Sequence, residues 1–128
     1  MKKIQVIGLP GSGKTTGINI YIDKNKDMSV LDLATFKAPG RERLFTEAIK
    51  KQDSDLIAES ACGVDLSGTY VVKLKITESK LIDQLLQRGD KFDLCYTSYL
   101  VSQMLPANYT VSNSEQLAEV LQTLFKRY

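Results

Sequence analysis

The chain has 128 residues, of which 43% are hydrophobic and 25% are charged, and 17 Lys and Arg against 15 Asp and Glu give a net charge of +2. This length suits a single domain over residues 1–128, and so small a charge does not favour a surface that binds nucleic acid. Histidine is absent, which excludes Ser-His-Asp triads and histidine zinc sites. Any chemistry must rest on carboxylates, Lys, Arg, hydroxyls and metal.

Secretion and membrane insertion are also disfavoured. No stretch approaches the roughly 20 apolar residues of a membrane span, and the apolar run after Met1-Lys2-Lys3 is too short for a signal peptide. Cys62 and Cys95 lack metal-type spacing, so buried thiols in a reducing compartment are the favoured reading. We therefore expect a cytoplasmic protein without a membrane partner; its oligomeric state is not predicted.

Apolar runs alternate with longer mixed stretches along the chain, which is typical of a parallel sheet covered by helices. Strands are expected at residues 4–7, 30–33, 56–58, 70–76 and 109–111. Helices are expected at residues 15–24, about 41–52, 78–88, about 94–104 and 115–126. Residues 112–115, SNSE, read as a capping box at the start of the last helix.

The most specific motif lies between the first strand and the first helix. Residues 8–15, GLPGSGKT, match G-x-x-x-x-G-K-[ST], a glycine-rich loop whose backbone N–H groups surround a phosphate at a helix N-terminus. A glycine turn that merely caps a helix, with Lys14 solvated, is the weaker alternative because strand, loop and helix occur in the required order. The residues expected to bind ATP are Gly8, Pro10, Gly11, Ser12, Gly13, Lys14, Thr15 and Thr16.

Three of these residues have particular roles under this interpretation. Lys14 reaches the β- and γ-phosphates and neutralises charge in the transition state, and the Thr15 hydroxyl ligates Mg²⁺. Thr16 either contacts the α-phosphate or is an ordinary residue of the first helical turn.

Two acids lie where the predicted strands end, and ligands of open α/β sheets bind outside those ends. Glu59 follows an apolar run and would hold Mg²⁺ or polarise the attacking group; the alternative is a carboxylate that caps the next turn. Asp32 is a candidate base or anchor for an acceptor hydroxyl, or equally a structural acid at a strand end. Nearby Mg²⁺ would keep either one ionised.

Basic residues supply further candidates. Arg88, beside the helix-ending Gly89, would stabilise the transferring phosphoryl group, or it is simply favoured by the helix dipole. Arg41 and Arg43 would grip a phosphate or carboxylate of the acceptor, or they begin a solvated helix. For the lysines at 73 and 75 in the strand 70–76, buried stems with ammonium groups reaching water are the favoured reading, over a lysine pointing into the site.

In this order, residues 8–16, Asp32, Glu59 and the last strand with its turn resemble the P-loop kinases of the nucleoside and nucleotide kinase group, which includes the adenylate, thymidylate and shikimate kinases. The resemblance implies an α/β fold with a five-stranded parallel sheet in the order 2-3-1-4-5 and helices on both faces. It implies phosphoryl transfer from ATP with Mg²⁺ to a small acceptor, foremost a nucleoside or nucleotide, or a modified base or sugar in a polynucleotide. It also places Asn113 near the adenine.

The chain departs from typical members in being shorter, which leaves open whether a second chain completes the acceptor site. A nucleotide-binding or ATPase module that regulates a partner is the alternative function. A GTPase is a third reading, because residues 65–68, DLSG, match D-x-x-G, but no Asn-Lys-x-Asp follows to read guanine.

Overall fold

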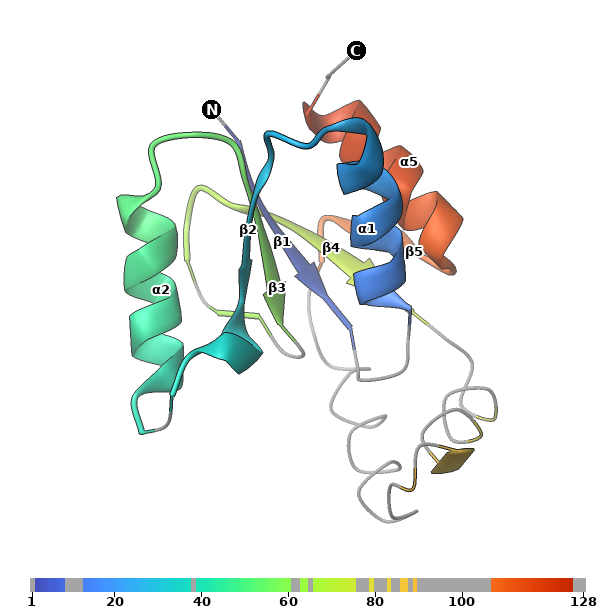
Figure 1. The fold of residues 1–128 in the computed structure, drawn as a ribbon, viewed down its shortest axis with the longest axis horizontal. Helices are drawn as coiled ribbons and strands as arrows, with labels where there is room; N and C mark the ends of the chain where they lie inside the picture. Colours follow the sequence, from blue (N-terminus) through green and yellow to red (C-terminus); the bar gives the residue numbers. More distant parts are fainter. Residues whose placement is uncertain are drawn as a thin grey trace.

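The computed structural model contains a five-stranded parallel sheet in the order β2-β3-β1-β4-β5 (Figure 1). It describes residues 2–8, 13–37, 39–60, 63–64, 66–75 and 107–125, together with residues 79, 83, 86, 87 and 89. The strands are β1 Lys3–Ile7, β2 Ser29–Asp32, β3 Leu56–Ser60, β4 Tyr70–Leu74 and β5 Tyr109–Val111. The helices are α1 Lys14–Lys24, α2 Arg41–Lys51 and α5 Ser114–Phe125, with a short 3-10 helix η1 at Leu33–Thr35. The predicted strand order is confirmed.

The sheet divides the core into two parts. Helices α1 and α5 lie side by side on one face, where residues such as Ile4, Val6 and Ile57 meet buried residues of both helices (Figure 1). On the other face Phe45 and Ile49 of α2 pack with residues of β3. Every residue of β3 is buried, as expected of a parallel strand covered on both faces. None of the helices in the described ranges combines the length and apolarity that crossing a membrane requires.

A glycine allows α1 and α5 to approach closely. A Cβ on Gly17 would lie 2.6 Å from Leu117 Cδ2 and 2.9 Å from the backbone oxygen of Ser114, so a larger residue would force the helices apart. At the far end of the pair the rings of Tyr21 and Phe125 stack with their centroids 5.7 Å apart. The two helices therefore form one packed layer that begins at the carboxyl edge of the sheet.

The connection from β3 to β4, residues 61–69, is shorter than a helical crossover requires. The buried side chain of Gln5, on β1, holds this connection against the sheet. Its Nε2 donates to the Val64 backbone oxygen (3.0 Å) and to Thr69 Oγ1 (2.9 Å), and its Oε1 accepts from the Val64 N–H (2.9 Å). The Gln5 amide thus satisfies both backbone groups of Val64 and holds the connection beside β1.

Several expected boundaries differ from the structure. The second strand ends at Asp32, not residue 33, because the Asp32 side chain accepts from the Ala34 N–H and starts η1 there. The third strand is longer than 56–58 and includes Glu59 and Ser60, because both pair in register with β1. The fourth strand ends at Leu74. Of the helix at 78–88, residues 79, 83, 86 and 87 are helical, whereas 94–104 lies outside the described residues.

The cap of α5 is shifted by one residue from the expected box. Asn113 Oδ1 accepts from the Gln116 N–H (2.8 Å), and Gln116 Oε1 accepts from the Ser112 N–H (2.9 Å). Asn113 and Gln116 therefore take the places that the sequence suggested for Ser112 and Glu115. Asn is as good an N-cap as Ser, and its longer side chain reaches the third helical N–H.

Lys73 and Lys75 differ in their exposure. The residue is only 9% exposed, whereas Lys75, after the strand ends, is exposed. Burial, together with the nearby charge of Lys75, lowers the pKa of Lys73 from its usual 10.5. Lys73 lies on the face of β4 opposite Val72 and Leu74 and is largely buried there, which agrees with the expected buried stem.

Candidate functional site

The candidate site lies at the carboxyl edge of the sheet, where α1 begins. In Figure 1 this edge is at the bottom, and the arrowheads of β1 and β3 point to it. Gly13 precedes α1 in the left-handed conformation, with φ +94°, and its carbonyl accepts the first helical bond, from the Gly17 N–H at 3.0 Å. The backbone N–H groups of the first turn point toward this end of α1, and the helix dipole adds partial positive charge there, which makes it suited to an anion.

The hydroxyl of the phosphate-loop motif and the strand acid are in direct contact. Thr15 Oγ1 donates to Glu59 Oε1 at 2.5 Å, joining residues 44 apart in sequence. Glu59 is 5% exposed and lies on the α1 face of β3, beside Val6 of β1. Lys14 Nζ donates to the Gly8 backbone oxygen at 3.0 Å, so the lysine spans the motif between its first glycine and the helix.

The chemistry of this pair fits a magnesium ion. Mg²⁺ in nucleotide sites prefers oxygen ligands and is held by one or two carboxylates together with substrate phosphates and water. The Thr15 hydroxyl and the Glu59 carboxylate supply two such oxygens at one point. Among the described residues, no group of three or more Asp, Glu, His or Cys side chains is arranged to hold a metal ion.

Asp32 lies next to Glu59. The two residues are register partners in β2 and β3, and residues in register on parallel strands point to the same face. Asp32 therefore shares the α1 face of the sheet edge with Glu59. Its Oδ1 accepts from the Ala34 N–H at 2.9 Å, so the structural role considered for this acid is present.

The basic candidates are less closely placed. Arg41 and Arg43 are both exposed in the first turn of α2. Arg41 Nε donates to the Phe36 backbone oxygen at 2.8 Å and so fixes the connection into α2, while Arg43 lines a groove of about 410 Å³ between α2 and residues 63–64. Thr16 is exposed on α1. Arg88, Pro10, Gly11 and Ser12 lie outside the described residues.

The start of α5 adds a contact that the sequence did not predict. Ser114 Oγ donates to the Gly13 backbone oxygen at 2.8 Å, so α5 is bonded to the end of the phosphate-loop motif. The sequence contained Ser114 within a capping pattern, but nothing local indicated a partner 101 residues away. Asn113, expected near an adenine, is exposed and uses its side-chain oxygen to cap α5.

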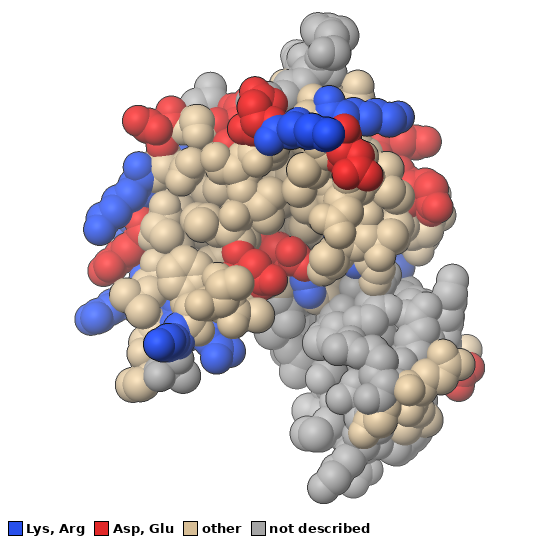
Figure 2. Space-filling view, viewed as in Figure 1, with Lys and Arg blue, Asp and Glu red and all other residues tan. Residues whose placement is uncertain are grey.

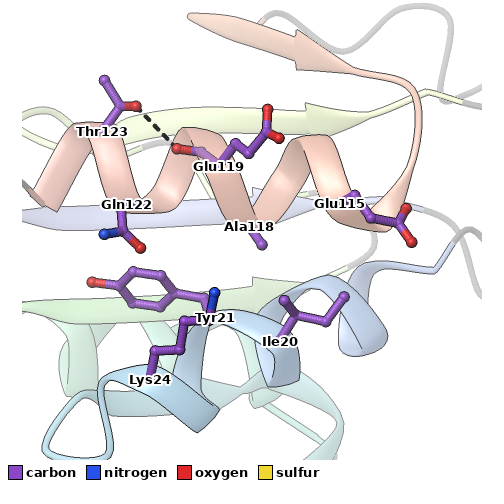
Figure 3. Close-up of a pocket in the computed structure, with 8 residues that line it drawn as sticks. All are labelled: Ile20, Tyr21, Lys24, Glu115, Ala118, Glu119, Gln122 and Thr123. Atoms are coloured by element: carbon purple, nitrogen blue, oxygen red, sulfur yellow. Dashed lines mark hydrogen bonds between the residues drawn. The ribbon is translucent and has the colours of Figure 1, made fainter.

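A groove of about 520 Å³ runs between α1 and α5 (Figure 3). Tyr21 and Lys24 of α1 face Gln122 of α5 across it, and Glu115 and Glu119 lie along α5. The described residues that line the groove belong to α1 and α5 and do not include Gly8, Gly13, Lys14 or Thr15. Over the described part of the face in Figure 2, acidic and basic side chains are interspersed, in keeping with the small net charge.

Neither a family model nor a curated protein matches the sequence, but solved structures match it over nearly its full length. Shikimate kinase from Bacteroides thetaiotaomicron is 16% identical with a TM-score of 0.66, and the match covers 98% of this chain and 99% of that one. The chain has the fold of the shikimate kinase-like P-loop kinases. YorR from Bacillus subtilis, solved in complex with phosphorylated GDP, is 12% identical with a TM-score of 0.72, covering 98% and 96% of the two chains. At such identities the likeness shows the fold alone.

A shikimate kinase from Acinetobacter baumannii, solved in complex with shikimate, is 15% identical to this chain, with a TM-score of 0.65 and coverage of 98% and 94%. The similar structures therefore include proteins whose bound molecules differ in chemistry. The fold class expected from the sequence is confirmed, and the similarity leaves the acceptor unassigned.

Proposed function

We propose that this protein is an ATP-dependent kinase that transfers the γ-phosphoryl group to a hydroxyl of a small acceptor, with nucleosides and nucleotides as the acceptor class. The observation that carries the proposal is the hydrogen bond from Thr15 to Glu59. It brings the hydroxyl of the phosphate-loop motif and a buried strand acid to one point at the start of α1, beside a second acid, Asp32. This is the donor set that phosphoryl transfer from a magnesium-bound triphosphate requires.

Each residue has a role in the transfer. Backbone N–H groups from Gly13 onward hold the phosphates, and Lys14 neutralises charge on the β- and γ-phosphates. Thr15 and Glu59 would hold Mg²⁺, which when bound withdraws charge from the phosphate oxygens. The acceptor hydroxyl attacks the γ-phosphorus, the bond from that phosphorus to the bridging oxygen of ADP breaks, and Asp32 accepts the hydroxyl proton. Arg88 would add positive charge at the transferred group.

The acceptor class rests on the family resemblance and on the position of Arg41 and Arg43. Both arginines begin α2, which follows the Asp32 strand, and a guanidinium pairs well with a phosphate or carboxylate. A nucleotide carries such a phosphate. Shikimate carries a carboxylate, and three of the similar structures are shikimate kinases, so polyol acids belong in any screen. A net charge of +2 does not favour a polynucleotide acceptor. We place the activity in the cytoplasm, where ATP is available.

The deciding experiment is an acceptor screen with purified protein, ATP and Mg²⁺. ADP release is followed by a coupled assay across nucleosides, nucleotides and polyol acids, and the phosphorylated product is identified by mass spectrometry. Acceptor-dependent ADP release with a phosphorylated nucleoside or nucleotide supports the proposal. ATP binding without any phosphorylated acceptor would favour a regulatory nucleotide-binding module instead. Absence of ATP binding by calorimetry would remove the proposal altogether.

A further inference from the structure

The last glycine of the phosphate-loop motif is held from two sides. Its backbone oxygen accepts from the Gly17 N–H at 3.0 Å, within α1, and from Ser114 Oγ at 2.8 Å, from α5. A Cβ on Gly13 would lie 2.7 Å from Ser114 Oγ, and the φ of +94° itself favours glycine. The hydrogen bond from Ser114 therefore requires a glycine at position 13, because a side chain there would occupy the place of the serine hydroxyl.

We propose that Ser114 is a positioning residue for the phosphate loop, acting through the peptide plane between Gly13 and Lys14. This inference rests on the proposed binding of a phosphate tail at the start of α1. A trans peptide is planar, so its C=O and its N–H point in opposite directions. Fixing the Gly13 oxygen from two sides therefore also fixes the direction of the Lys14 N–H. That N–H points toward the N-terminal end of α1 and is one of those expected to face the phosphate.

The serine is itself mounted on a rigid turn. Asn113 caps α5 by accepting from the Gln116 N–H, and the Gln116 side chain accepts in return from the Ser112 N–H. One turn further on, Leu117 is fully buried against α1. Because both helices are anchored, the Ser114 hydroxyl has little freedom to follow a displaced loop. The bond is thus able to hold the loop in its binding geometry before the ligand arrives, which reduces the ordering cost of binding.

The test compares Ser114→Ala with Ser114→Thr, which keeps a hydroxyl, and with Ser112→Ala, which removes an exposed hydroxyl from the same turn. Calorimetry with tripolyphosphate and with ATP, both with Mg²⁺, measures the affinity for the phosphate tail well below each melting temperature. Loss of one hydrogen bond predicts an affinity about 3- to 10-fold weaker for Ser114→Ala. Ser114→Thr should recover to within about twofold, and Ser112→Ala should match the natural chain.

Amide hydrogen exchange at Gly17 supplies a readout that needs no ligand. The Gly17 N–H shares its acceptor with Ser114, so it should exchange faster in Ser114→Ala and unchanged in Ser112→Ala. If Ser114→Ala lowers the melting temperature but leaves both affinity and Gly17 exchange as they are in Ser112→Ala, the positioning role is wrong. If the natural chain binds neither ATP nor tripolyphosphate, the proposed function fails, and Gly17 exchange still decides whether Ser114 fixes the loop.

Discussion

The two sides of the candidate site are built differently. On the phosphate side, bonds connect segments far apart in the chain: Thr15 to Glu59, and Ser114 to Gly13. On the proposed acceptor side, the bonds are local: Asp32 accepts from Ala34 two residues on, and Arg41 donates to Phe36 five residues back. Glu59 is buried, whereas Arg41 is exposed.

This difference indicates which half of the function the fold itself provides. Tertiary contacts hold the phosphate side in place, so its geometry is part of the folded state and changes little from one ligand to another. In the described residues Asp32 and Arg41 bond within their own segments, so we expect these side chains to be able to re-orient around a bound molecule. We therefore expect the contacts to a phosphate tail to stay the same with different acceptors, and the contacts to the acceptor to change. The following predictions test that division.

The largest effect is expected from Lys14→Ala. Removing the ammonium leaves the charge that develops on the β- and γ-phosphates without its closest side-chain cation, which predicts a fall in kcat of at least ~10²-fold. The coupled ADP assay measures it, with Lys24→Ala in the last turn of α1 as the matched control. Near-normal turnover in Lys14→Ala would show that the motif does not act as a phosphate loop here.

Substitutions of the neighbouring acids Glu59 and Asp32 should affect ATP binding differently. Glu59→Gln keeps an oxygen for the Thr15 hydroxyl but removes the charge, so we expect a higher Mg²⁺ requirement and a loss in kcat on the order of 10²-fold. Asp32→Asn should reduce kcat through loss of the base by a similar factor but leave the ATP dissociation constant within about twofold. Calorimetry with MgATP compares the two variants. Equal weakening of ATP binding in both variants would contradict the assignment of Glu59 to the phosphate side and Asp32 to the acceptor side.

The close contact of α1 and α5 at Gly17 predicts an effect on the free energy of unfolding. Gly17→Ala places a methyl group 2.6 Å from Leu117 Cδ2 in the α1–α5 contact and should lower the free energy of unfolding by about 1–3 kcal/mol. Urea unfolding measures the change, and Asn19→Ala on the exposed face of the same helix is the control. A Gly17→Ala variant as stable as Asn19→Ala would mean that the helices separate at little cost.

The smallest effect concerns the buried Lys73. Its pKa is lowered in the folded state, so between that pKa and 10.5 the unfolded chain binds more protons, and stability should rise with pH across this window. The melting temperature of the natural chain should therefore increase relative to that of Lys73→Met as the pH rises toward 10.5. Lys51→Met, at the exposed end of α2, should show no such trend. A constant difference for Lys73→Met would argue against the burial of its charge.

Much of the phosphate side could be predicted from the sequence because its signals are local. The glycine pattern, Lys14 and Thr15 occupy one continuous segment, and an apolar run before Glu59 marks its strand. Strand order followed from the family resemblance and was confirmed. Asp32 and Glu59 were predicted separately, and the structure adds that they are register partners.

The remainder depended on tertiary contacts that leave no local pattern. The bond of Ser114 to Gly13 joins the two ends of the chain, and the burial of Lys73 depends on what covers β4. Gln5 was hidden inside an apolar run because a single polar residue does not interrupt a buried strand. The cap of α5 was placed one residue early because Ser and Asn are nearly equivalent caps, and only the backbone geometry distinguishes Asn113 from Ser112.

Gln5 of β1 bonds the connection between β3 and β4, so the residue at position 5 and the length of that connection are related. Its amide matters because the short connection between β3 and β4 is bonded to it at Val64 and Thr69. In homologues, an aliphatic residue at this position should accompany a longer, helical crossover, and glutamine a short one. An engineer who grafts a longer insertion there should therefore redesign the first strand at the same time.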